Sequence, residues 1–103
     1  MTMHRYMKVS EIVTQLHVES AFLDALVAAD LIHLKETSEG DLVLSAEDAE
    51  RVRLASVLTA EMEVNLPGVE VIVHMRDSLL AMQRQFSEIL DALVQEVRSR
   101  LPR

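Results

Sequence analysis

Cysteine is absent from the 103-residue chain, and only three residues are aromatic. The first absence excludes disulfide bonds, thiol catalysis and zinc fingers. The second argues against a surface that stacks the bases of single-stranded nucleic acid. Only Gly40 and Gly68 are glycines, so no glycine-rich phosphate loop can form. The N-terminus lacks the apolar run of a signal peptide, and no apolar run reaches about 18 residues. We therefore expect a soluble cytoplasmic protein without a membrane segment.

Half of the residues are hydrophobic, which suffices for one domain with a real core. Ten Lys and Arg stand against seventeen Asp and Glu, a net charge of −7 that does not favour phosphate backbones. Between Val9 and Glu50 the only base is Lys35, against ten acids. This acidic stretch is either an ordinary solvated surface or a docking face for a basic partner. Arg98, Arg100 and Arg103 crowd the C-terminus, where they can complement a helix dipole.

Apolar residues at helical spacing predict two short helices near the N-terminus. The first covers Val9–Leu16, with Ser10 as candidate cap, and the second lies within 19–29. His17-Val18 breaks the pattern between them, so the two helices read as a helix-turn-helix unit. Two apolar segments, 31–35 and 42–44, then flank a polar connection with Gly40, which predicts a hairpin. The order is that of a winged helix-turn-helix.

Two further helices are expected after the hairpin. Ser45, with Asp48 three residues later, is typical of a capped helix start, and this helix should run to about Met62. The next helix, capped by Asn65 or Leu66 with Pro67 in its first turn, should run to Leu101. At 1.5 Å per residue it would be about 50 Å long, too long for a globule of this size.

Apolar residues recur along this last helix every seven positions, with a second set three residues after the first. This is an a/d seam of about three heptads, which predicts dimerisation, with a kink or break near Gln83–Gln85 left open. A helix folded back onto its own domain is the alternative. The dimer-interface candidates are Ile72, Met75, Leu79, Met82, Phe86, Ile89 and Leu93. A second row that widens the stripe comprises Leu80, Leu90, Val94 and Val97.

From Met7 to about Leu101, this order of parts resembles the MerR-type regulators. Those proteins follow the second helix with a pattern like Arg-Tyr-Tyr and then Gly-Leu. With Gly-Leu placed on Asp30-Leu31, the Arg-Tyr-Tyr positions hold Asp24-Ala25-Leu26. Leu42-Val43-Leu44 stand where relatives carry Arg-x-Tyr before the capping serine. A carboxylate where a phosphate-binding arginine should stand repels DNA, so we expect no specific DNA binding.

The pattern is more similar to the chaperone modulatory protein CbpM family, a MerR-like branch. The segment Glu63–Ile72 is similar to that family's helix entry, with an apolar residue before Pro-Gly and an aliphatic residue after it. The family often has Trp before the proline, where this chain has Leu66. Met75–Leu80 and the polar, Gln-rich continuation also fit. The resemblance implies a homodimer that binds and inhibits the J-domain of a DnaJ-like co-chaperone (CbpA), whose basic helix is recognised by Hsp70.

The sequence offers little support for catalysis or for metal binding. Glu70, His74 and Asp77 share one helical face, but one helix supplies at most two or three ligands and no partner motif is evident. The serines have no nucleophile-elbow or SxxK setting. We therefore expect no enzyme activity, no metal and no cofactor.

The sequence thus predicts a mainly α, MerR-like winged helix-turn-helix with a small β-hairpin wing over 1–66. A long C-terminal dimerisation helix over 67–103 forms part of one compact unit. The predicted function is inhibition of a J-domain co-chaperone by occlusion of its Hsp70-facing basic surface. A divergent MerR-type DNA-binding transcription regulator and a structural dimerisation module are the alternatives. The partner-binding candidates are Asp24, Asp30, Glu36, Glu39 and Asp41.

Overall fold

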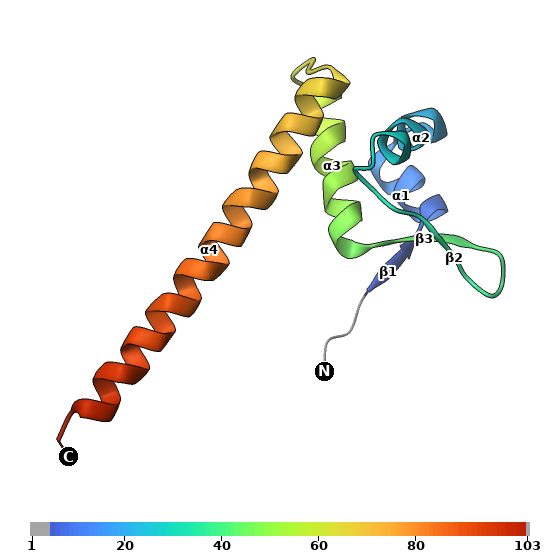
Figure 1. Ribbon diagram of the computed structural model, residues 1–103. Coiled ribbons are helices and arrows are strands. Elements are labelled where there is room, and N and C mark those ends of the chain that lie inside the picture. Colours follow the sequence, from blue (N-terminus) through green and yellow to red (C-terminus); the bar gives the residue numbers. More distant parts are fainter. Residues whose placement is uncertain (1–4, 103) are drawn as a thin grey trace. The chain divides into compact units, whose positions relative to one another are not determined.

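The computed structural model describes residues 5–102 and confirms a mainly α winged helix-turn-helix with a long C-terminal helix (Figure 1). Contacts divide the chain into two units, the first ending at Val73 and the second beginning at His74. The sequence-based boundary at 66/67 follows the start of the last helix, whereas residues 67–73 belong to the first unit by their contacts. The elements are β1 (Tyr6–Lys8), α1 (Val9–Leu16), α2 (Ser20–Ala28), β2 (Lys35–Glu36), β3 (Leu42–Ser45), α3 (Ala46–Ala60) and α4 (Leu66–Arg100).

The wing is a three-stranded antiparallel sheet rather than the two-stranded hairpin expected. Strand β1 pairs with β3, Met7 opposite Leu44, and gives the order β1-β3-β2. Leu31 and Ile32, expected in the hairpin, lie before β2 and are buried in the core. The turn between β2 and β3 places Gly40 at φ 89°, a left-handed conformation that glycine adopts at low cost.

Two of the three predicted helix caps are confirmed. Ser45 Oγ accepts a 3.1 Å hydrogen bond from the Asp48 backbone N–H at the start of α3. Asn65 Oδ1 likewise accepts a 3.0 Å bond from the Gly68 N–H at the start of α4. The Ser10 cap is wrong, because α1 already begins at Val9 and Lys8 occupies the cap position without a side-chain bond. Helix α3 ends at Ala60, slightly before the expected Met62.

The core of the first unit collects side chains from α2, the segment after it, β3, α3 and the start of α4. Each fully buried aliphatic side chain contributes about 1.5–3 kcal/mol relative to an exposed one. Because two of them come from α4, the first two turns of that helix are anchored in this core. The largest fully buried residues are Leu26, Leu31, Ile32, Leu44, Val52, Val69 and Val73.

Helix α4 continues through Gln83–Gln85 without the break that the sequence left open, as Figure 1 shows. In the second unit its large apolar side chains are exposed, with Leu79 at 55% and Phe86 at 62% of their full area. Within residues 5–102, no helix combines the length and the hydropathy required to cross a membrane.

Candidate functional site

Helix α2 is the second helix of the helix-turn-helix, the position from which such units read DNA bases. Its nine residues, SAFLDALVA, contain neither Lys or Arg nor Asn or Gln. Leu23 and Leu26 face the core, so the outer face carries Asp24 together with small and apolar side chains. Base edges are read mainly by Arg, Lys, Asn and Gln. The outer face of α2 therefore offers one carboxylate among small and apolar side chains, and none of the side chains that usually read base edges.

The five acidic partner-binding candidates all lie in the first unit. They differ in their exposure and in whether their carboxylates already contact another side chain. Asp24, Asp30, Glu36 and Glu39 are exposed. Asp41 is half-buried, and its carboxylate lies 3.6 Å from Lys8 Nζ. Asp30, in a left-handed conformation after α2, has its Oδ1 2.9 Å from His33 Nε2. The structure thus groups Glu36, Glu39 and Asp41 around the β2–β3 turn, with Asp24 on a separate element.

The outer face of the sheet carries the two lysines of the wing. Lys35 Nζ donates a 3.1 Å hydrogen bond to the Tyr6 hydroxyl and lies 5.3 Å from the centre of the tyrosine ring. Lys8 pairs with Asp41. Sequence reasoning missed these contacts because β1 has only three residues, too few to show an alternating pattern.

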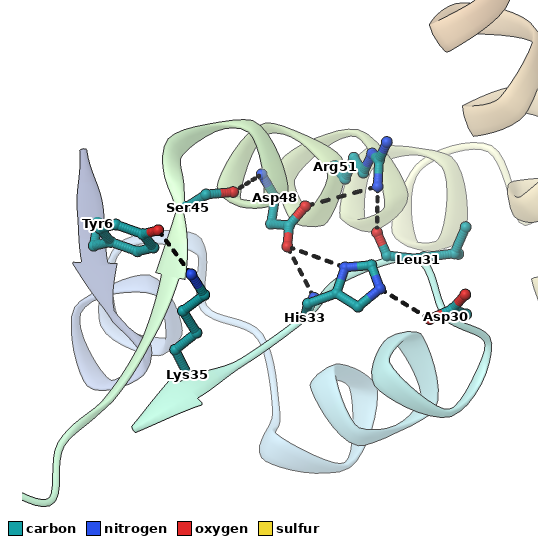
Figure 2. Close-up of polar contacts among 8 residues, drawn as sticks. All are labelled: Tyr6, Asp30, Leu31, His33, Lys35, Ser45, Asp48 and Arg51. Carbon is teal, nitrogen blue, oxygen red and sulfur yellow. Dashed lines mark hydrogen bonds and ion pairs between the residues drawn. The ribbon is translucent and has the colours of Figure 1, made fainter. Parts of the chain in front are cut away.

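A polar network around Asp48 joins the entry of the wing to α3 (Figure 2). Asp48 is 8% exposed, and its Oδ2 accepts a 2.8 Å hydrogen bond from the His33 backbone N–H. Its Oδ1 lies 3.7 Å from Arg51 Nη1, which donates to the Leu31 carbonyl at 2.9 Å. The sequence indicated Asp48 only as part of a helix cap. The network ties the segment between α2 and β2 to the first two turns of α3.

Exposed apolar side chains follow α4 through the second unit in two rows. At its C-terminal end Leu90, Leu93, Val94 and Val97 line an apolar depression. Six of the seven dimer-interface candidates are more than half exposed, whereas Ile72 is half-buried against the core of the first unit. The six are Met75, Leu79, Met82, Phe86, Ile89 and Leu93.

No group of three or more His, Asp or Glu side chains within residues 5–102 is arranged to hold a metal ion. No buried side-chain nitrogen or oxygen in this range lacks a hydrogen-bond partner. The polar groups described above serve to hold the fold or lie at its surface.

A comparison with known protein families gives a match that agrees with the order of helices and strands described above. Residues 7–90 match the family described as MerR HTH family regulatory protein. A search among curated proteins finds no match. The match covers most of the chain, including both helices of the helix-turn-helix, the wing, α3 and much of α4. The chain belongs to the MerR helix-turn-helix family of regulatory proteins.

Proposed function

We propose that the chain is a chaperone modulator: a homodimer that binds the J-domain of a DnaJ/CbpA-like co-chaperone and inhibits it by covering its basic, Hsp70-facing surface. The observation that carries the proposal is the outer face of α2, where Asp24 stands among small and apolar residues. A helix built in this way has an apolar centre and an acidic charge, which complements a basic helix. It lacks the donors that DNA would require.

The charge of the whole first unit supports the same partner. Residues 5–73 contain thirteen Asp and Glu but only five Lys and Arg. Four of these bases already contact an acceptor within the unit: Lys8, Lys35, Arg51 and Arg53. The remaining excess of acidic groups, with Glu36 and Glu39 exposed on the wing, favours a partner with a basic surface. Complementary charge of this kind mainly speeds association and selects the partner.

Helix α4 supports the dimer. Its exposed rows extend over more than three turns, and an exposed apolar stripe of this length is typical of an interface. The heptad spacing of Leu79, Phe86 and Leu93 suits a second helix of the same kind.

A DNA-binding regulator is the second candidate, because the family match includes the entire helix-turn-helix. In this alternative Lys8 and Lys35, on the outer face of the sheet, would approach the phosphates. Both already have partners, Asp41 and Tyr6, and the neighbouring carboxylates would repel the DNA.

An ATPase assay tests the proposal. Purified Hsp70 is stimulated by its J-domain co-chaperone, and the chain is added in increasing amounts. We expect the stimulated ATPase rate to fall to the unstimulated rate, while Hsp70 alone is unaffected. If the stimulated rate does not change when the chain is in excess, the chaperone-modulator function is wrong.

A further inference from the structure

A small hollow on the first unit lies where the turn between α1 and α2 meets the C-terminal end of α3. Its volume is about 180 Å³. Val18 and Phe22 supply apolar residues, His17 and Glu19 polar ones, and α3 contributes Ser56, Thr59 and Ala60. A cavity of about 150 Å³ accommodates a benzene-sized group, so one large apolar side chain would fit here.

The turn between α1 and α2 forms one side of this hollow. His17 ends α1 in a left-handed conformation, with φ 54°, and Val18 then turns inward and is 9% exposed. Glu19 occupies the cap position of α2 but makes no side-chain capping bond. Glu19 is exposed and is one of the residues that line the hollow.

The surroundings of the hollow are suited to a cation. The C-terminal ends of α1 and α3 both lie here, and neither helix has a basic residue in its last turn. The negative pole of each helix is thus left without a basic side chain. Arg53, one turn before Ser56, is paired with Glu50 at 2.8 Å, and that hydrogen bond raises the pKa of Arg53. The N-terminal pole of α2 offsets part of this negative charge, while Glu61 adds a carboxylate directly after Ala60.

We infer that the hollow receives one apolar side chain from the basic segment of the J-domain partner, and that an adjacent Lys or Arg of that segment pairs with Glu19. The inference rests on the function proposed above and adds an anchor point to it. This anchor is separate from the acidic candidates of α2 and the wing, none of which lines the hollow.

Two pairs of variants test the anchor. Ser56→Leu fills the hollow, and Gln15→Leu places the same side chain at an exposed position of α1 that does not line it. Glu19→Gln removes the charge, and Glu11→Gln, also exposed on α1, is its control. The J-domain is titrated into each protein by calorimetry, and a thermal melt followed by circular dichroism checks that each is folded.

We expect Ser56→Leu to weaken J-domain binding about tenfold or more. Glu19→Gln should weaken it about two- to fivefold, and both controls should stay within about twofold of the parent. If Ser56→Leu does not fold, the comparison of Glu19→Gln with Glu11→Gln decides. If the parent binds and the hollow variants bind equally well, the anchor is wrong and the proposed function stands. If the parent does not bind, the proposed function fails and the anchor fails with it.

Discussion

The backbone N–H of His33 donates a 2.8 Å hydrogen bond to Oδ2 of Asp48, fifteen residues further along the chain. This bond joins the segment that leads into the wing to the first turn of α3. The same carboxylate lies near Arg51, which in turn donates to the Leu31 carbonyl. Asp48 therefore connects the segment that leads into the wing with the start of α3.

Replacing Asp48 with alanine should destabilise the first unit by about 1–3 kcal/mol, because the His33 N–H loses its acceptor in a partly buried place. Denaturant unfolding measures the loss. Asp48→Asn keeps an acceptor oxygen and should cost less. Glu47→Ala, one residue earlier and exposed, is the matched control. Equal stability of Asp48→Ala and Glu47→Ala would show that the network contributes little.

Replacing both Leu79 and Phe86 with glutamate should give monomers. Each change would place a charge in an apolar interface, where an unpaired carboxylate is strongly disfavoured. Light scattering at micromolar concentration should find dimers for the parent and for Arg84→Glu, which changes an exposed position between the two seam residues. A monomeric parent, or a double variant that remains dimeric, would contradict the seam.

Specific DNA binding should be absent. The outer face of α2 lacks base-reading side chains, and the unit to which it belongs is acidic. Anisotropy titrations with random and candidate promoter DNA should show no tight complex at about 0.15 M salt. A salt-sensitive complex of sub-micromolar affinity would favour the DNA-binding regulator instead.

We expect slower association with the J-domain, and an intact dimer, when three exposed acids are replaced with lysine: Asp24, Glu36 and Glu39. Each exposed charge pair contributes only about 0.2–1 kcal/mol, so the effect should be collective. Stopped-flow or surface-resonance kinetics should show a reduced association rate with a dissociation rate that changes less. Reversal of Glu70, Glu88 and Asp91 on α4 is a control of equal charge. If both triple variants associate at the same rate, the docking face is not formed by α2 and the wing.

The helices and two of their caps could be predicted from the sequence because their signals are local. Ser45 and Asn65 lie three residues before the N–H groups whose hydrogen bonds they accept. Gly40 predicts the turn of the wing for the same reason, because glycine itself favours the left-handed conformation and needs no distant partner for it. The length of α4 is predicted by the sequence because no proline follows Pro67 until Pro102.

Strand β1 and the role of Asp48 could not be predicted because they depend on partners far away in the sequence. Tyr6–Lys8 becomes a strand only by pairing with β3, and three residues show no periodicity of their own. Asp48 meets the His33 N–H only after the chain has folded back from α2. The same holds for the acidic candidates: their charge was visible, but not that Asp30 and Asp41 already have partners in His33 and Lys8.

Calorimetric titration of the J-domain of a DnaJ-like co-chaperone into the chain, at about 0.05 and 0.3 M salt, tests the central claim most directly. We predict saturable binding at both salt concentrations, weaker at the higher one because the opposing charges are screened. The apolar centre of the outer α2 face should preserve part of the affinity at high salt. The absence of binding at the lower salt concentration, where electrostatic attraction is strongest, would contradict the claim that this MerR-family chain acts on a J-domain.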